Sequence, residues 1–479
     1  MIYWCNMRNL LIYKYVGKVL LGFSFLLLAP FIVCLFYGES LVPFLIPFIL
    51  SLTLGYYLNS KKVTNNGLYA KDGLIIVALS WLIIGLLSAI PLYLGSNISF
   101  VDSLFESISG LTTTGVTIYP NVEILSKSIL FWRSYIIFIG GMGVLTFVMA
   151  LLPLAKGDKS LHILNAEMPG PSVSKLTPGI KKTLFYLYAI YLILTVLEII
   201  LLMFGKLPFF DSLLISMSTA GTGGFTILND GIASYGMYNQ YVIAVFMLLF
   251  GVNFNVYFLI AMKDFKSALK SEELKAYGII FTGLVAVVIL NTYNLFSSFS
   301  ETFVSAFFHV SSVMTSTGFA IGDINIYSTA CRILFLCAML VSACSGSTCG
   351  GFKISRLLIT LKSIKRDFLR AIHPNSVQTI TFEGKEVDDN VTKAISSYLF
   401  LYAFCIIIIM VFVSLDGLTL SETANAVFTT FANNGLCFEI SNFSVFSDFS
   451  KVVMSIGMLL GRLEIYPLLV IFTRYRKWN

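Results

Sequence analysis

The amino-acid sequence predicts an all-α polytopic membrane protein. Four pseudo-repeats of span, re-entrant pore half-helix and span would surround one central pore, with two additional N-terminal transmembrane helices. Of the 479 residues, 57% are hydrophobic and only 12% are charged, about half of the charged share that soluble domains carry. Many apolar runs approach the roughly 20 residues that a transmembrane helix needs. A glycine-containing polar string recurs four times between these runs.

The apolar runs are expected to be helices, because each backbone polar group in lipid must be satisfied within its own segment. They also lack the period-two alternation of a membrane β-barrel. The first run follows a basic start, but it is too long for a signal peptide and no small-residue cleavage site follows, so we expect a retained span. The predicted spans are residues 17–37, 41–59, 73–94, 127–153, 182–205, 238–262, 276–292, 328–345, 394–415 and 450–473.

The Lys and Arg residues predict the orientation, because cytoplasmic loops carry an excess of both. All but six of the 32 lie near the two ends of the chain or in 61–71, 156–182, 263–275 and 353–393. Ten spans with both termini in the cytoplasm fit this alternation. The net charge of +7 therefore reflects topology, and no nucleic-acid partner is expected.

The four glycine strings read TTTGVT, GTGGFT, TSTGFA and ANNGLC, at residues 112–117, 221–226, 315–320 and 432–437. Each follows a semi-polar segment of about 12 residues, which is too short to cross a bilayer and suits a re-entrant half-helix. A polar residue 13 positions before each glycine would open the half-helix at its N-terminus, and each outgoing span carries glycines. The half-helices are expected at 101–112, 210–221, 304–315 and 421–432, opened by Asp102, Asp211, Ser305 and Glu422.

Such strings are suited to an ion filter. A cation that leaves water needs oxygen ligands, and rings of backbone carbonyls supply them. Glycine permits the unusual dihedral angles that point carbonyls at one axis, and the negative C-terminal ends of the half-helices favour a cation. Four repeats in one chain would surround a whole pore.

Several stretches together resemble the TrkH branch of the Trk/Ktr/HKT cation-transporter superfamily, notably DSLFESISGLTTTGVT, WRSYIIFIGGMGVL, GSTCGGFKISR and GMLLGRLEIYPLL. The resemblance runs from about residue 72 to about residue 475. It implies potassium uptake across the bacterial cytoplasmic (inner) membrane through a gated, channel-like pore, with K+ in the filter and no other cofactor. It also implies a homodimer in the lipid bilayer and a cytosolic TrkA-like nucleotide-binding ring as regulatory partner.

The resemblance implies the residues of the K+-binding filter. Four glycines in matching positions resemble the K+-selective members, while Asn433, Asn434 and Cys437 depart from the other strings and leave the K+ to Na+ selectivity ratio open. The implied filter residues are Thr114, Gly115, Gly223, Gly224, Thr317, Gly318, Asn434 and Gly435.

A gate is expected where SACSGSTCGG interrupts the third outgoing helix. Three glycines disfavour a helix and predict an unwound intramembrane loop at 342–351, although small residues also suit helix packing. Arg462 lies within a span, where an ionised residue is functional by default; the resemblance implies a gating charge, and the alternative is a structural pair with Glu464 or a loop carbonyl. The predicted gate residues are Gly346, Ser347, Thr348, Gly350, Gly351 and Arg462.

Other readings are weaker. The three histidines are scattered and no hydrolase or phosphate-binding motif occurs, so an enzyme is not expected. An ion-coupled symporter of the same fold (H+ or Na+) stays open, with Glu198 and Glu106 as intramembrane carboxylates. A poorly selective K+/Na+ pathway also stays open. Segment 353–393 is either a docking surface or a topology-setting loop, and the resemblance favours docking; Lys353 and Arg356 are expected as cytoplasmic anchors.

The repeats predict five units along the chain. A two-helix N-terminal unit is followed by the four pore repeats. The predicted boundaries are 1–71, 72–160, 161–270, 271–375 and 376–479.

Overall fold

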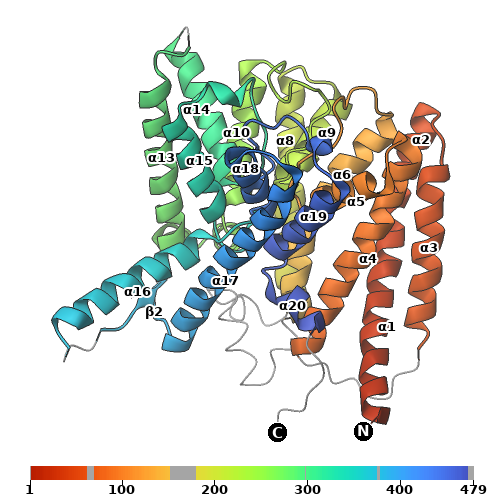
Figure 1. Ribbon diagram of the computed structural model, residues 1–479, viewed down its shortest axis with the longest axis horizontal. Helices are drawn as coiled ribbons and strands as arrows, with labels where there is room; N and C mark the ends of the chain where they lie inside the picture. The colour runs from red at the N-terminus through yellow and green to blue at the C-terminus, as the bar shows by residue number, and fades with distance from the viewer. Residues whose placement is uncertain (1, 62–69, 152–179, 297, 375–377, 473–479) are drawn as a thin grey trace.

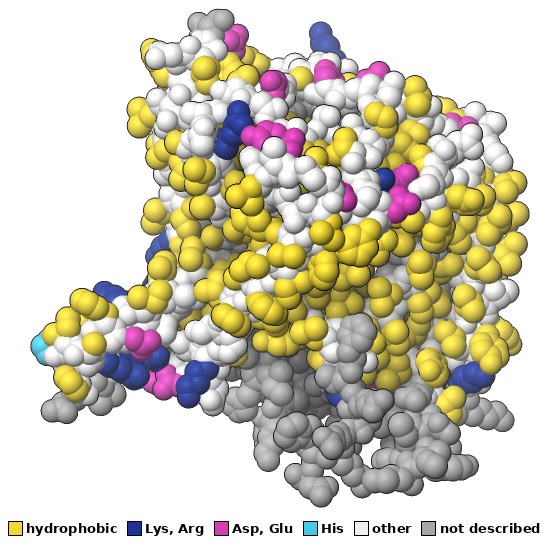
Figure 2. Space-filling model, in the orientation of Figure 1, with side chains coloured by type: hydrophobic (Ala, Val, Ile, Leu, Met, Phe, Trp, Pro, Cys, Tyr) yellow, Lys and Arg dark blue, Asp and Glu magenta, His cyan; other side chains and the backbone are white. Residues whose placement is uncertain are grey.

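The computed structural model describes residues 2–61, 70–151, 180–296, 298–374 and 378–472. Long helices run side by side between two ends of the molecule, and α1 begins at the same end at which α20 finishes (Figure 1). Apolar side chains form a broad band across the visible face, while charged side chains gather toward the two ends (Figure 2). This distribution is the one expected of a protein surrounded by lipid.

Six helical stretches among the described residues are long and apolar enough to cross a membrane, and each coincides with a predicted span. A seventh is added if the bent pair α10–α11 counts as one span. The six lie in α1 (Ile2–Leu26) with α2 (Leu28–Tyr37), α3 (Val42–Asn59), α4 (Ala70–Ser96), α8 (Ile180–Phe204), α13 (Glu272–Thr292) and α17 (Asp389–Val413).

Of the remaining predicted spans, 127–153 corresponds to one continuous helix, and 328–345 to a helix that ends at Val341, directly before the predicted loop at 342–351. The other two, 238–262 and 450–473, are each broken into two helices, so the prediction of continuous spans there is wrong. The helices concerned are α6 (Lys127–Leu151), α10 (Met237–Gly251), α11 (Phe254–Ala261), α15 (Thr329–Val341), α19 (Asp448–Arg462) and α20 (Tyr466–Phe472).

The backbone takes a different form at each of the two breaks. Helices α10 and α11 meet at 90°, and the Asn253 side chain accepts a hydrogen bond from the backbone N–H of Asn255 (3.0 Å), which caps the new helix. Between α19 and α20, Glu464 and Ile465 have positive φ angles of 58° and 65°, a conformation that ends a right-handed helix. A proline marks the second break: Pro467 is the second residue of α20, and the residue before a proline disfavours the α-helical conformation.

The four predicted half-helices are confirmed as α5 (Phe100–Leu111), α9 (Phe209–Gly221), α14 (Phe299–Met314) and α18 (Leu420–Phe431). Three of them end directly before their glycine strings, and α9 ends at the first residue of its string, so the C-terminal carbonyls of all four face the strings. The half-helix α14 has 16 residues where the others have 12 or 13. The third repeat therefore begins about one turn earlier than predicted.

The predicted N-caps are wrong. Ser99, Ser298 and Thr419 cap their helices through the side chain, and Pro208 precedes α9. An acidic residue occupies the third helical position in every repeat, where it complements the positive end of the helix dipole. Ser305, predicted to open α14, lies well inside that helix, and Glu301 is the acidic residue of its first turn. These acidic residues are Asp102, Asp211, Glu301 and Glu422.

Glycines bring two outgoing helices against the half-helices. A Cβ on Gly140 of α6 would lie 2.0 Å from the Leu111 carbonyl oxygen, and one on Gly461 of α19 would lie 1.9 Å from that of Phe431. Leu111 and Phe431 are the last residues of α5 and α18. No side chain larger than hydrogen fits at these contacts.

The third repeat continues into a projecting arm. The helix α16 (Ile354–Ile372) leaves the body at an angle and is followed by a small antiparallel hairpin of β1 (Thr381–Phe382) and β2 (Lys385–Glu386) (Figure 1). The short helix α12 (Phe265–Lys270) precedes α13. Glu383, in the hairpin turn, accepts hydrogen bonds from the Ser271 hydroxyl (2.8 Å) and the Glu273 N–H (3.1 Å), which ties the hairpin to the start of α13.

Candidate functional site

The four glycine strings share one local backbone geometry. The second residue of each has a positive φ of 50–56°, and the glycine a positive φ of 63–88°. The N–H of the third residue donates to the carbonyl five residues earlier, at 2.8–3.0 Å in all four strings. This agreement in four places far apart in sequence supports the predicted repeat.

The strings also contact one another in a closed cycle. A Cβ built on each string's glycine would lie 1.7–2.3 Å from the carbonyl oxygen of the third residue in the next string. Because the fourth string returns to the first, the strings surround a common axis. The facing pairs are Gly115 with Gly223, Gly224 with Thr317, Gly318 with Asn434, and Gly435 with Thr114.

Side chains behind the strings hold the backbone in place. The Ser109 hydroxyl donates to the Val116 carbonyl (2.6 Å), and Ser312 does the same to Phe319 (2.7 Å). The second and third residues of each string are buried. The eight predicted filter residues are thus brought together.

The departures of the fourth string have structural partners. The Asn433 side-chain amide donates to the Thr114 hydroxyl and to the Met458 carbonyl, both at 2.9 Å. That of Asn434 donates to the Val313 carbonyl (2.7 Å). The two amides therefore tie the fourth string to the first string and to α14.

The segment between α15 and α16 is unwound, as predicted for 342–351. Ser342, Gly346, Gly351 and Lys353 all have positive φ angles. The loop lies against the glycine strings: the Gly350 N–H donates to the Ser316 hydroxyl (2.9 Å), and the Thr222 hydroxyl donates to the Thr348 carbonyl (3.1 Å). The predicted gate residues are therefore adjacent to the predicted filter.

Arg462 binds this loop. Its Nη1 donates to the Thr348 carbonyl (2.7 Å) and its Nη2 to the Gly140 carbonyl of α6 (3.2 Å). The side chain is buried. Glu464 pairs with Arg356 instead, so of the two structural alternatives the loop carbonyl is the one observed.

Lys353 and Arg356, predicted to be cytoplasmic anchors, have partners within the protein. Both are buried. The Lys353 ammonium donates to the Cys349 carbonyl of the loop, and the Arg356 guanidinium lies 4.6 Å from the centre of the Tyr398 ring. They anchor the end of the loop within the protein.

Glu273 is a site residue that sequence reasoning missed. One carboxylate oxygen accepts from the N–H groups of Ser345 (2.7 Å) and Ser355 (3.2 Å), at the two ends of the loop. The other accepts from the Asn253 side chain at the bend between α10 and α11 (3.4 Å). Only the fold brings these segments together, because they lie far apart in the chain.

The carboxylates proposed for coupling have different surroundings. Glu106 is buried and forms an ion pair with Arg133. Glu198 on α8 is also buried, without an ion-pair partner among the described residues. Within those same residues, no group of three or more His, Cys, Asp and Glu side chains could hold a metal ion.

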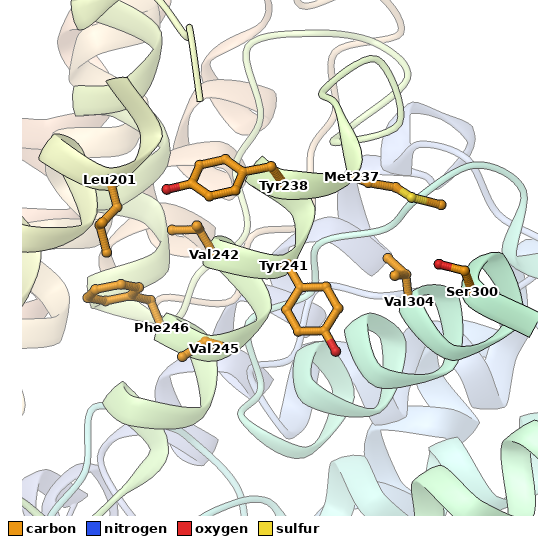
Figure 3. Close-up of a pocket in the computed structure, with 9 residues that line it drawn as sticks. All are labelled: Leu201, Met237, Tyr238, Tyr241, Val242, Val245, Phe246, Ser300 and Val304. Atoms are coloured by element: carbon orange, nitrogen blue, oxygen red, sulfur yellow. The ribbon is translucent and has the colours of Figure 1, made fainter. Parts of the chain in front are cut away.

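A cavity of about 440 Å³ lies away from the glycine strings, between α8, α10 and α14 (Figure 3). Its lining is mostly apolar and includes none of the predicted filter or gate residues. Tyr238 and Tyr241 line it and are partly exposed. The lining residues are Leu201, Met237, Tyr238, Tyr241, Val242, Val245, Phe246, Ser300 and Val304.

Comparison with known proteins identifies the family. The TrkH model, described as a cation transport protein, matches residues 42–476. The chain belongs to the TrkH family. It is 34% identical to the Trk system potassium uptake protein TrkG of Escherichia coli K12, over 95% of each chain. It is 32% identical to TrkH of the same strain, over 96% of this chain and 97% of that protein.

The fold agrees with that of a solved TrkH. The crystal structure of the potassium transporter TrkH from Vibrio parahaemolyticus matches with a TM-score of 0.88 and 29% identity, over 98% of this chain and 100% of that one. Membership of the TrkH family confirms the predicted all-α, multi-pass membrane fold and a transport role rather than an enzymatic one. The division into five units stays a prediction.

Proposed function

We propose that this protein takes up K+ through a gated, channel-like pore whose selectivity filter is the ring of four glycine strings. The observation that carries the proposal is the closed cycle of glycine–carbonyl contacts. In this cycle the glycine of each string lies against a backbone carbonyl of the next string, directly after the four half-helices, which supports a ring of carbonyl ligands. The relatives TrkG and TrkH are named potassium uptake proteins, which supports K+ as the ion.

The filter would work through the backbone. The carbonyls of Thr114, Gly223, Thr317 and Asn434 would replace water around a dehydrated K+, and so would those of the adjoining glycines. The C-terminal ends of α5, α9, α14 and α18 would add a favourable negative potential. K+ is the cargo of this site.

The loop 342–351 and Arg462 would form the gate. The loop lies against the second and third strings, and Arg462 holds it to α6. A buried guanidinium beside the pathway would also raise the barrier to a permeating cation. Opening would require the loop to leave its carbonyl and hydroxyl partners.

The partners and topology follow the family expectation. The protein would form a homodimer in the bacterial cytoplasmic membrane, with both termini in the cytoplasm and a TrkA-like ring docked on the cytoplasmic side. The projecting α16 and its hairpin fit the docking role proposed for 353–393. Most of the basic segment 156–182 lies outside the described residues, which resume at residue 180. Arg474, Arg476 and Lys477 also lie outside them.

Cation flux into liposomes tests the function. The purified protein should carry K+ in preference to Na+, without dependence on a pH or Na+ gradient. A flux driven by either gradient would support the coupled symporter instead. Equal K+ and Na+ fluxes would support the poorly selective pathway, and no flux under any condition would contradict a self-contained pore.

Replacement of Glu273 by Gln should raise flux in the absence of the cytosolic partner. The loop ends would then be held by hydrogen bonds to a neutral acceptor, a loss of about 2 kcal/mol over two bonds. The open population would rise roughly thirtyfold. Liposome flux without partner measures this. Glu272→Gln is the matched control, because Glu272 pairs with the part-exposed Lys362 and does not touch the loop; an equal rise in both variants would contradict the assignment.

A further inference from the structure

A buried ion pair stands behind the first two glycine strings. Nε of Arg133, on α6, lies 2.8 Å from Oε1 of Glu106, on the half-helix α5, and the two side chains are 2% and 0% exposed. The filter and gate described above use neither residue. Burial of two charges costs desolvation energy, which is offset only when the pair has good geometry and its remaining polar atoms are hydrogen-bonded.

The pair reaches the outer ends of both strings. Arg133 Nη1 donates a hydrogen bond to the Thr226 carbonyl (3.1 Å), and Nη2 donates one to the Thr117 hydroxyl oxygen (3.2 Å). Glu106 accepts from that same hydroxyl (3.0 Å) and from the Ile118 N–H (2.9 Å). Thr117 and Thr226 each stand two residues beyond the string's glycine, so one rigid unit holds equivalent points of neighbouring strings.

Aromatic rings restrain the guanidinium further. Its central carbon lies 4.2 Å from the centre of the Phe225 ring and 5.4 Å from that of Tyr119. Phe225 directly follows the glycine of the second string. The planar fork of Arg133 is thus fixed by a carboxylate, by two strings and by stacking, an arrangement that a lysine could not reproduce.

The equivalent positions differ between the repeats. Glu106 stands nine residues before Gly115, and His309 stands nine residues before Gly318. His309 accepts from the Ile321 N–H (3.1 Å), the counterpart of the bond between Glu106 and Ile118. The second and fourth repeats have Ile215 and Ala426 there, which cannot make this bond.

We propose that Arg133 and Glu106 are specificity-positioning residues, which we call the outer clamp: they hold the outer ends of the first and second strings apart at the spacing that favours K+ over Na+. The inference rests on the filter proposed above. Na+ is smaller than K+, so the ring must close inward to coordinate it. A clamp that joins two neighbouring strings from behind resists that closure and leaves Na+ under-coordinated.

Liposome flux of K+ and Na+ tests the clamp with three variants. Glu106→Gln removes one charge at constant volume. The double variant Glu106→Gln with Arg133→Met removes both charges, so that neither is left buried and unpaired. Arg133→Lys keeps the charge but cannot span both strings. Each variant should lower the K+ to Na+ flux ratio at least tenfold while K+ flux per folded protein falls by less than about threefold (0.7 kcal/mol at 1.4 kcal/mol per tenfold).

A merely structural role would lower the yield of folded protein and leave the ratio unchanged. The control is Glu439→Gln, which removes one partner of the part-exposed Arg332–Glu439 pair (3.2 Å) and should not change the ratio. A native ratio in any folded clamp variant would overturn the proposal; Arg133→Lys decides the matter if the double variant is not recovered folded.

The experiments can contradict the outer clamp and the filter assignment independently of each other. If Gly115→Ser leaves the ratio unchanged, the filter assignment itself is wrong. If Gly115→Ser lowers the ratio and the clamp variants do not, the filter stands and the outer clamp alone is wrong.

Discussion

Replacement of Gly115 by Ser is expected to reduce the K+ to Na+ flux ratio at least tenfold. A Cβ at this position would lie 1.7 Å from the Gly223 carbonyl oxygen, and Gly115 has a φ of 81°. The backbone must shift, because a carbonyl cannot rotate away as a flexible side chain can, and the positive φ adds about 1–2 kcal/mol of strain. A displaced carbonyl removes a ligand from the ring, and each 1.4 kcal/mol of lost discrimination is tenfold in selectivity.

Gly322→Ser separates the two effects. Gly322 has a similar φ of 68°, but a Cβ there meets nothing within 4 Å. It shares the backbone strain without the clash, so its flux ratio should stay native. K+ and Na+ fluxes into liposomes measure both variants, and equal ratios in the two would contradict a filter at Gly115.

Replacement of Arg462 by Met is expected to raise the flux measured without the cytosolic partner about a hundredfold. Two hydrogen bonds from a charged donor, to Thr348 and to Gly140, are lost. Their combined contribution of about 3 kcal/mol to holding the loop corresponds to roughly two powers of ten. The buried positive charge beside the pathway disappears as well.

The Arg462→Lys variant separates the effect of the two hydrogen bonds that hold the loop (the tether) from the effect of the positive charge. Lysine keeps the charge but presents a single ammonium, which cannot bridge carbonyls on two segments as the guanidinium does. A Lys variant that behaves like Met would assign the effect to the tether, and one that behaves like the native protein would assign it to the charge. Partner-free flux as low as native in both variants would remove Arg462 from the gate.

The two carboxylates considered for an ion-coupled symporter, Glu106 and Glu198, differ in their surroundings. Glu106 is held by Arg133, by two N–H or O–H donors and by full burial, so it is not a free carboxylate facing a pathway. Glu198 has no ion-pair partner in the part of the chain that the structure describes, and it is the carboxylate to replace first if liposome flux depends on a proton gradient. Glu198→Gln should leave an uncoupled flux unchanged.

Much of the fold was predictable because its signals are local. Long apolar runs predict spans, since lipid offers no partner for backbone groups. The half-helices could be placed from their length and from the glycines after them. Ser298 and Glu301 form the same pattern of cap and acidic residue as Thr419 and Glu422, so attention to this signal would have placed the start of α14 correctly.

The breaks in the helices were harder to predict. The bend at Asn253 and the positive φ angles at Glu464 and Ile465 fall inside runs that are largely apolar, and Pro467 is a local signal of the second break. What holds them is contact with distant segments, such as the hydrogen bond from Asn253 to Glu273. A local pattern carries no record of such a contact.

Hydrophobicity, helix length and backbone freedom are properties of neighbouring residues, so the membrane class, the four glycine strings and the glycine-rich loop can be recognised in the amino-acid sequence. The folded chain is needed to see that the strings meet in a closed cycle, that Glu273 joins both ends of the loop, and that Arg133 and Glu106 bind two strings at once. These contacts join residues from different helices, and their distances and orientations depend on how whole helices pack.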